Sequence, residues 1–267
     1  MGGADDTAGR PAWNVPDADG GVTARRRRAA VAKPRSCGDH PGVSLKVIGG
    51  EYGGRVLKAV RGLGTRPLLG QVRGALFNIL QDVTDGAYVW DLFAGTGASG
   101  IEALSRGAAR VLFVEKNGKA LATLRDNLGL LGPGAEERAC LVRGDAWEPP
   151  AMTPAVFGAP ARDDAAAADA EVAPDLVFLD PPYALVAEDP VKCLAKARRL
   201  LERTAPHGCV LFHFAAGVLD DDDFGDEIDV DLREWGSTAI ALMWRGGEAP
   251  ARVQRRWSRE GGRERAD

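Results

Sequence analysis

The sequence predicts an α/β protein with a doubly wound, mostly parallel sheet of seven strands. Five near-continuous apolar runs alternate with helix-length segments from residue 88 onwards. A glycine-rich turn follows the first run, and two alternating runs late in the chain are typical of an antiparallel hairpin. Buried strands separated by helices indicate a parallel sheet, because the crossover helices cover both of its faces.

The N-terminal part of the chain contains two different patterns. Residues 1–43 are rich in Gly, Ala, Asp, Pro and Arg and have no apolar period, so we expect a disordered basic tail. Short strand-like runs at 44–50 and 54–60 flank a glycine turn and predict a small β-hairpin. Apolar residues at helical spacing then predict a helix over 70–83.

The rest of the domain follows in a regular order. Strands are expected at 88–93, 110–115, 139–144, 175–180 and 209–214, helices at 98–106, 117–131 and 189–204, and the closing hairpin at 227–235 and 237–245. One domain therefore spans 44–246. The low-complexity stretch 149–174 predicts an exposed insertion within it, and 247–267 predicts a loose C-terminal tail.

Length and composition limit the classes to which the protein can belong. It has 267 residues, of which 45% are hydrophobic, which is enough for the core of an enzyme. No apolar run approaches the roughly 20 residues of a membrane span, and the N-terminus lacks a secretory layout, so we expect a cytoplasmic protein with no membrane partner. The cysteines and histidines are scattered, so we expect neither a disulfide framework nor a metal site.

Positive charge is concentrated in the N-terminal third of the chain. The formal net charge is −4, yet residues 22–73 carry +10 and the remainder −14. Such a region is typical of a polyanion-binding surface, because phosphate contacts release counterions. For Arg25–Arg28 a solvated tail is the alternative. The candidate contacts to substrate RNA are Arg55, Lys58, Arg61, Arg66 and Arg73.

The turn after the first strand of the sheet has the spacing of a nucleotide-binding loop. Gly95, Gly97 and Gly100 form G-x-G-x-x-G at a strand-to-helix junction, where glycines permit a tight turn and close approach of a ligand. Glu115 ends the second strand, 20 residues after Gly95, where a carboxylate can accept hydrogen bonds from ribose hydroxyls. A nucleoside-containing cofactor is therefore expected.

Two kinds of cofactor fit this loop, a nicotinamide dinucleotide and S-adenosylmethionine (SAM). Asp91, just before the loop, would repel a pyrophosphate but can pair with the ammonium of a methionine moiety. Asp145 follows the third strand and can accept from an adenine amino group while the Ala146 amide donates to the ring. A helix N-cap is the alternative role for Asp145.

The fourth strand ends in the tetrapeptide Asp180-Pro181-Pro182-Tyr183, which should lie beside the glycine loop because the first and fourth strands are neighbours in such a sheet. An exocyclic base amine is a poor nucleophile that must be held on fixed acceptors. Asp180 and the Pro181 carbonyl supply these acceptors, and the prolines hold the backbone rigidly. Tyr183 supplies a face for base stacking, so loss of its hydroxyl alone is expected to be almost silent.

These motifs resemble the RsmD family, the bacterial 16S ribosomal RNA (guanine-N2)-methyltransferases. Asp/Asn-Pro-Pro-Tyr/Phe is the signature of amino-methyltransferases that act on nucleobases. The resemblance covers about Leu45 to Arg245, through the blocks "VIGGEYGGRVL", "RPLLGQVRGALFNIL", "DLFAGTGASGIEALSRGA", "VLFVEKN", "LVFLDPPY" and "REWGSTAIALMWR". It implies a Rossmann-like SAM-dependent methyltransferase fold, a ribosomal RNA or small-subunit assembly particle as partner, and a monomer.

The resemblance also implies roles for individual residues. Asp180 to Tyr183 would hold the target guanine as the catalytic group. The residues expected to bind SAM are Asp91, Phe93, Gly95, Gly97, Glu115, Lys116, Asp145 and Ala146.

The chain departs from the family pattern at several positions. Leu68-Leu69-Gly70 stands where the family usually has Thr-Thr-Asp, Gly74 where it has Glu, and His213 where it tends to have a carboxylate. Three alternatives to guanine-N2 methylation therefore stay open: adenine-N6 methylation of DNA or RNA, a non-catalytic RNA-binding relative, and a nicotinamide dehydrogenase. The last would leave the tetrapeptide without a role.

Overall fold

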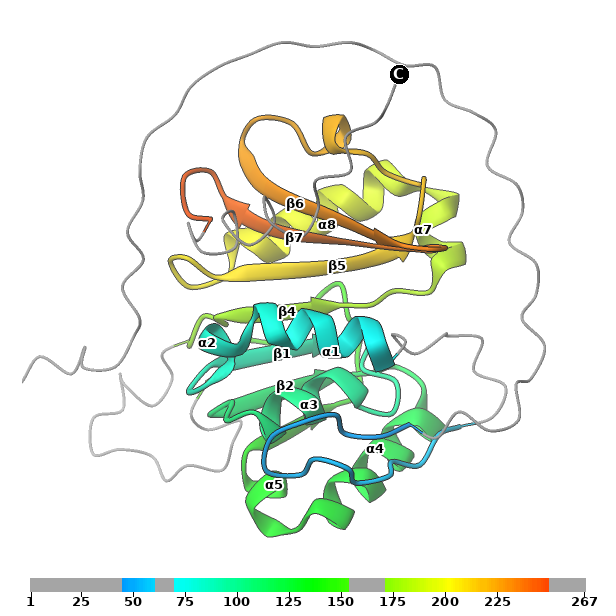
Figure 1. The fold of residues 1–267 in the computed structure, drawn as a ribbon, viewed down its shortest axis with the longest axis vertical. Helices are drawn as coiled ribbons and strands as arrows, with labels where there is room; N and C mark the ends of the chain where they lie inside the picture. The colour runs from blue at the N-terminus through cyan, green and yellow to red at the C-terminus, as the bar shows by residue number, and fades with distance from the viewer. Residues whose placement is uncertain (1–44, 61–69, 154–170, 250–267) are drawn as a thin grey trace, which may run out of the picture.

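A seven-stranded sheet forms the centre of the molecule in a computed structural model that describes residues 45–60, 70–153 and 171–249 (Figure 1). The strand order is β3-β2-β1-β4-β5-β7-β6. The strands are β1 (Tyr88–Leu92), β2 (Arg110–Val114), β3 (Ala139–Val142), β4 (Leu176–Leu179), β5 (Cys209–Ala215), β6 (Ile228–Trp235) and β7 (Thr238–Arg245). The first five are parallel, and β7 runs antiparallel to both β5 and β6. This confirms the predicted fold class.

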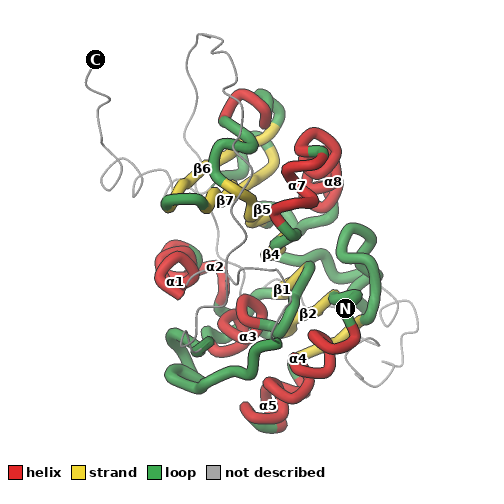
Figure 2. Tube along the Cα trace, turned by 90° about the vertical axis from the view of Figure 1, so that its right-hand side faces the viewer, coloured by secondary structure: helices red, strands yellow, loops and turns green. Residues whose placement is uncertain are grey.

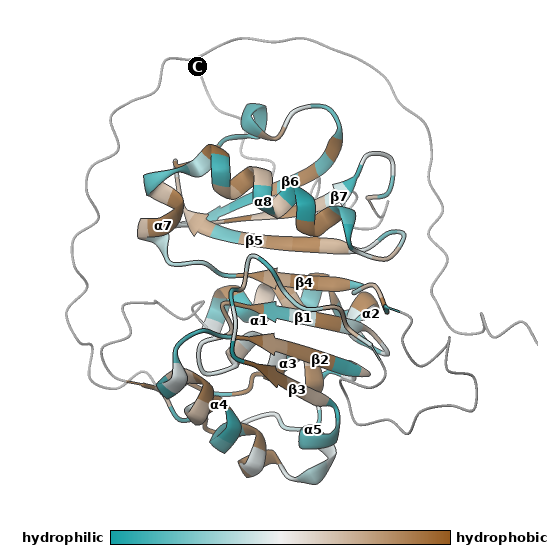
Figure 3. Cartoon of the chain, turned by 180° about the vertical axis from the view of Figure 1, so that it is seen from behind, coloured by the Kyte–Doolittle hydropathy of each residue, from teal (hydrophilic) through white to brown (hydrophobic). Residues whose placement is uncertain are grey.

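Helices cover both faces of the sheet (Figure 2). They are α1 (Gly70–Ile79), α2 (Gln81–Thr84), α3 (Ala98–Ser105), α4 (Gly118–Leu131), α5 (Pro133–Glu137), α7 (Tyr183–Glu188), α8 (Pro190–Glu202) and the 3-10 helix η2 (Asp221–Phe224). Helices α1, α3 and α4 pack on one face and α7 and α8 on the other, with the apolar strands between them (Figure 3). Among the described residues, no helix has the length and apolar content needed to cross a bilayer.

Side chains of β1 alternate between the two cores. Val89 packs in the core under α1, α3 and α4, whereas Trp90 and Leu92 pack in the core under α7 and α8. Asp91 shares the face of Val89, because successive strand residues point to opposite faces. A carboxyl group therefore occupies a core position next to α3.

Local sequence signals explain where two of the longer helices begin. The Asn117 side chain caps α4 by accepting hydrogen bonds from the backbone N–H groups of Lys119 and Ala120. At α8, Asp189 accepts from Lys192 N–H, and Pro190 occupies the first turn, where its missing donor is not needed.

Some predicted elements differ from those observed. The helix expected over 70–83 is divided at Leu80 into α1 and α2. The expected N-terminal hairpin has a single antiparallel bridge, between Lys46 and Val56, rather than two extended strands. The short elements α5, α7 and η2 were not predicted, because 4 to 6 residues are too few to show a helical period.

The boundaries expected for the insertion and for the C-terminal tail need correction. Met152 is fully buried and accepts a hydrogen bond from Val172 N–H, so both ends of 149–174 belong to the packed domain. Ala249 is also buried, and its N–H donates to Asp229. Residues 1–44, 154–170 and 250–267, and with them the predicted N-terminal tail, lie outside the described part of the chain.

Candidate active site

The glycine loop joins β1 to α3 and is shaped by close contacts. Gly97 has φ +87°, and a Cβ there would come within 2.1 Å of the Leu124 side chain. A Cβ at Gly100 would come within 2.2 Å of the Phe113 ring. A larger residue at Gly97 would push the loop away from α4, and one at Gly100 would push α3 away from the sheet, so these two glycines set the place where the helix begins.

Asp91 lies beneath this loop with 2% of its surface exposed. Its carboxylate accepts a hydrogen bond of 2.8 Å from Gly100 N–H, at the first turn of α3. Burial, helped by the carboxylates of Asp180 and Glu115, raises the pKa of Asp91 to about 8 against the lowering effects of Gly100 N–H and Arg73. Among the described residues Asp91 forms no ion pair, although the Arg73 charge is near enough to lower its pKa.

The raised pKa of Asp91 predicts that stability falls as the pH rises. Since about 8 lies above the unfolded value near 4, the folded state keeps a proton that the unfolded chain has released. The stability that protonated Asp91 contributes to the folded state is fully present below about pH 4 and is lost as the pH rises toward 8. Between pH 6 and 7 the cofactor-free protein should lose up to about 1.4 kcal/mol more unfolding free energy than Asp91→Asn, measured by urea denaturation. Parallel pH curves for the two proteins would contradict the assignment.

Glu115 is joined to the glycine loop from the end of β2. Its two carboxylate oxygens accept hydrogen bonds from Gly95 N–H, at 2.9 Å, and from Asn117 N–H, at 2.7 Å. The neighbouring Lys116 is exposed. The structure therefore brings together Gly95 and Glu115, which the sequence placed 20 residues apart in one cofactor site.

Asp145, Ala146 and Phe93 lie at the same edge of the sheet. The exposed Asp145 accepts a hydrogen bond from Trp147 N–H, and no helix follows it, so the alternative role as a helix N-cap is wrong. Ala146 is buried. Phe93 has φ +60°, which is unusual for a bulky residue, and its ring meets that of Trp147 edge-on at 5.2 Å. Such strain is concentrated at functional sites.

The tetrapeptide lies beside the glycine loop, as expected from the pairing of β1 with β4. Asp180 Oδ1 is 2.5 Å from Nδ1 of His213, which lies on β5. Nε2 of His213 is 2.7 Å from the hydroxyl of Tyr183, and that hydroxyl is 3.0 Å from Oγ1 of Thr238 on β7. Four side chains, from β5, β7, α7 and the residue that follows β4, thus form one hydrogen-bonded row.

This row changes what is expected of Tyr183. The sequence indicated a stacking platform whose hydroxyl is dispensable. In the structure the hydroxyl has two side-chain partners, and the ring meets the His213 ring edge-on, with centroids 5.1 Å apart. Tyr183→Phe would leave Nε2 of the buried His213 without this partner, which is a destabilising change. The expectation of an almost silent substitution is therefore corrected.

The candidate RNA contacts fall into three groups. Arg55 and Lys58 are exposed, and Lys58 Nζ forms an ion pair of 2.8 Å with Asp126 on α4. Arg61 and Arg66 lie outside the described residues. Arg73 is 1% exposed, so the prediction that it contacts RNA is wrong.

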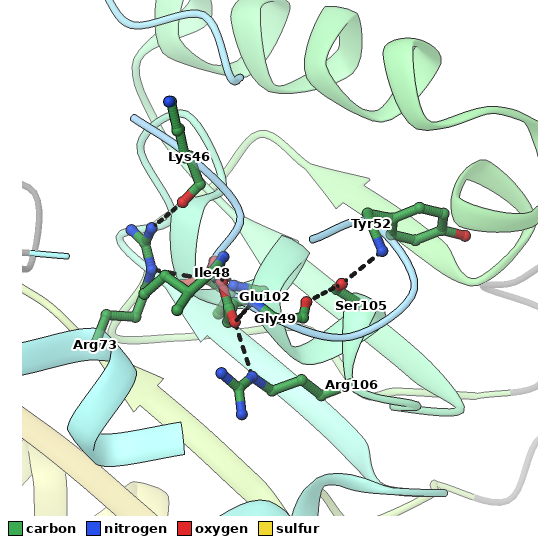
Figure 4. A network of polar contacts seen from close by, with 10 residues as sticks. Lys46, Ile48, Gly49, Tyr52, Arg73, Glu102, Ser105 and Arg106 are labelled. Carbon is green, nitrogen blue, oxygen red and sulfur yellow. Dashed lines mark hydrogen bonds and ion pairs between the residues drawn. The ribbon is translucent and has the colours of Figure 1, made fainter. Parts of the chain in front are cut away.

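Arg73 instead belongs to a buried network around Glu102 of α3 (Figure 4). One carboxylate oxygen of Glu102 accepts from Ile48 N–H at 2.7 Å and lies 3.8 Å from Arg73 Nε, and the other accepts from Gly49 N–H and from Arg106. Arg73 also donates to the carbonyl of Lys46. Burial lowers the pKa of Arg73, whereas the Glu102 charge opposes that shift. Through these contacts residues 46–49 of the N-terminal segment are hydrogen-bonded to α1 and α3.

Asn127 of α4 is a further connection that the sequence did not reveal. Its buried amide accepts from Lys58 N–H and donates to the carbonyls of Lys58 and Thr96, the middle residue between Gly95 and Gly97. One side chain therefore links the basic segment to the glycine loop. The only signal was a polar residue within the apolar period of a helix, which is weak by itself.

Known proteins match this chain over most of the candidate site. Residues 45–221 match the model of a family described as conserved hypothetical protein 95. The chain belongs to this family. It is the RsmD family that the motifs resembled.

Individual members of the RsmD family show how far the similarity extends. "Putative rRNA methyltransferase YlbH" from Bacillus subtilis (strain 168) is 32% identical over 203 residues, which cover 76% of this chain and 100% of that protein. "Ribosomal RNA small subunit methyltransferase D" from Escherichia coli (strain K12) is 41% identical over 90 residues, which cover 34% of this chain and 46% of that protein. A solved structure described as "Putative methyltransferase yhhF from Escherichia coli" has a TM-score of 0.57 at 26% identity, covering 76% of this chain and 99% of that one.

RsmD-family membership and this fold imply a SAM-type cofactor, and the residues present fit one. Three carboxylates, those of Asp91, Glu115 and Asp145, end neighbouring strands at one edge of the sheet. A Cβ at Gly95 would have only the Phe93 carbonyl within 4 Å among the described atoms, so a ligand can approach the backbone there. A nicotinamide pyrophosphate would instead meet the carboxyl group of Asp91.

Proposed function

We propose that this protein, an RsmD-family rRNA methyltransferase, transfers a methyl group from SAM to the exocyclic N2 amine of a guanine in 16S ribosomal RNA. The observation that carries the proposal is the position of Asp180, which directly follows β4 beside the glycine loop and is held there by His213. The reaction would take place in the cytoplasm, on ribosomal RNA or on an assembling small subunit. That the protein acts as a monomer stays a prediction.

In this proposal each carboxylate at the sheet edge has its own partner in the cofactor. Asp91 would face the ammonium group, which would favour its ionised form. Glu115 would accept from the ribose hydroxyls, and Asp145 from the adenine amine while Ala146 N–H donates to the ring. Bound SAM supplies an electrophilic methyl group on a sulfonium.

The tetrapeptide would prepare the target amine for attack. Asp180 and the Pro181 carbonyl accept its N–H hydrogen bonds and so orient the nitrogen lone pair. As the nitrogen forms its new bond to the methyl carbon, whose bond to sulfur breaks, it would become cationic, and the Asp180 carboxylate would stabilise that charge. The extra proton leaves to Asp180 or to water. The Tyr183 ring would hold the extruded base.

The direct test is methylation of ribosomal RNA from a strain that lacks the protein. Purified protein and SAM should convert one guanosine of its 16S RNA to N2-methylguanosine, detected by mass analysis of nucleosides. RNA from the complemented strain is the control and should accept no further methyl group. N6-methyladenosine as the product would favour the alternative target, which the same tetrapeptide could hold, and SAM binding without turnover would indicate a non-catalytic relative.

The basic N-terminal segment makes a separate prediction about RNA affinity. If Arg55 and Lys58 contact phosphates, the double variant Arg55→Ala/Lys58→Ala should weaken RNA binding and lower the salt slope of the affinity by roughly one unit per contact. The double variant Lys192→Ala/Arg199→Ala removes the same charge from exposed positions of α8 and serves as the matched control. SAM affinity should hardly change in either. An unchanged salt slope would mean that Arg55 and Lys58 are solvated surface residues that do not contact RNA.

A further inference from the structure

His213 is a buried ionisable side chain in contact with two residues of the tetrapeptide. Its side chain is 5% exposed, against 32% for that of Asp180. It lies on β5, opposite Ile240 of β7, so strands on both sides fix its backbone. Both ring nitrogens have side-chain partners, Asp180 at one end and Tyr183 at the other.

We propose that His213 is a positioning residue for methyl transfer, which as its Nδ1–H tautomer holds one oxygen of Asp180 and the hydroxyl of Tyr183. The effect of His213 on methyl transfer rests on the proposed function. For a neutral imidazole beside an ionised carboxylate, the tautomer follows from the hydrogen-bonding geometry and does not depend on the reaction.

The direction of each hydrogen bond follows from the chemistry of the partners. An ionised carboxylate has only acceptor atoms, so Nδ1 of His213 must donate to Asp180. A neutral imidazole has one donor and one acceptor nitrogen, so Nε2 accepts from the Tyr183 hydroxyl. The Tyr183 oxygen can then accept from the Thr238 hydroxyl. Of the two neutral tautomers only this one satisfies all four side chains, because the Nε2–H tautomer would set a lone pair of Nδ1 against Asp180 at 2.5 Å.

In this arrangement the two oxygens of the Asp180 carboxylate have different partners. Oδ1 is engaged by His213, and within the described part of the chain no hydrogen bond to Oδ2 is recorded. Oδ2 is therefore the oxygen that would meet the target amine. A carboxylate fixed at one oxygen loses its rotational freedom before the substrate arrives, which lowers the entropic cost of reaching the reactive geometry.

Two substitutions separate the two ends of the imidazole. In His213→Asn the side-chain amide reaches the place of Nδ1 and can still donate to Asp180, whereas in His213→Gln it reaches the place of Nε2 and retains only the contact with Tyr183. We expect kcat for 16S RNA to fall by up to about 10²-fold in His213→Gln and by clearly less in His213→Asn. The KM for SAM and its calorimetric affinity should stay the same in both, because the cofactor carboxylates lie on other strands.

A spectroscopic measurement tests the tautomer without requiring activity. The chain has only three histidines, so 15N-histidine labelling gives few signals to assign. His213 should show a protonated Nδ1 and an unprotonated Nε2, the reverse of the tautomer that free imidazole side chains prefer. In Tyr183→Phe the Nε2 resonance should shift, whereas Nδ1 should stay protonated.

Each outcome separates this inference from the proposed function. Equal losses of kcat in His213→Asn and His213→Gln, or an Nε2–H signal for His213, would overturn the positioning role while the wild-type protein still methylates RNA. A wild-type protein that shows the Nδ1–H signal but methylates no ribosomal RNA would instead overturn the proposed function. Should either variant fold poorly, as judged by its melting temperature, the wild-type spectrum still decides the tautomer.

Discussion

Asp180→Ala is expected to lower the turnover number for ribosomal RNA methylation by a factor on the order of 10² or more. The substitution removes the carboxylate that would accept from the target amine, and the alanine offers nothing in its place. Cofactor affinity should change little, because its expected contacts lie on Asp91, Glu115 and Asp145. The loss should therefore be in kcat, measured with saturating SAM on 16S RNA from the deletion strain.

The contact between Asp180 and His213 means that the stability of the Asp180→Ala variant must be measured as well. Removing Asp180 also leaves Nδ1 of His213 without its acceptor, so part of any loss could come from instability. Calorimetric SAM binding and the melting temperature of the variant report on that contribution. Asp226→Ala makes the same chemical change at an exposed turn and should leave turnover unchanged. Full methylation by Asp180→Ala would show that the tetrapeptide does not hold a base.

Glu102→Gln is expected to lower the free energy of unfolding by about 3–5 kcal/mol, the usual cost of breaking a buried ion pair from one side. The Glu102 side chain is fully buried, and it accepts hydrogen bonds from two backbone amides and from Arg106. The neutral amide keeps the shape but leaves the guanidinium of Arg73 buried without its counter-charge. Urea denaturation at neutral pH measures the change.

A double-variant comparison identifies the source of that loss. If the uncompensated Arg73 charge is responsible, Glu102→Gln/Arg73→Met should recover part of the stability, because both charges are then absent. Glu137→Gln, an exposed position on α5, is the matched control and should change stability by less than about 0.5 kcal/mol. A loss below about 1 kcal/mol in Glu102→Gln would mean that water reaches the network.

The buried network around Glu102 shows why the charge of a residue does not predict whether its side chain lies on the surface. Arg73 was counted with the basic residues that bind RNA, yet it turns inward from α1 toward Glu102. Leu76 and Phe77 of the same helix are both buried, and a helical plot places Arg73 between them, within the apolar face. That plot alone cannot reveal that an acidic partner lies on another helix.

The tetrapeptide shows the same limit at the candidate site. Its adjacency to the glycine loop could be predicted, because the order of strands in a doubly wound sheet follows from the alternation of strands and helices. The partners of Tyr183 could not. His213 and Thr238 lie 30 and 55 residues further along the chain, on strands whose pairing with β4 and with each other brings them together.

The sequence by itself determined the fold class, the order of the motifs and the edge of the sheet at which they meet. Apolar period, glycine spacing and strand ends are properties of short segments, and these can be recognised one at a time. Only the tertiary structure decided which polar partner each buried polar side chain meets: Arg73 meets Glu102, Asn127 meets the Thr96 carbonyl, and His213 meets Asp180. Such pairs form between segments far apart in the chain, and a buried polar group is stable only when the packed fold supplies its partner.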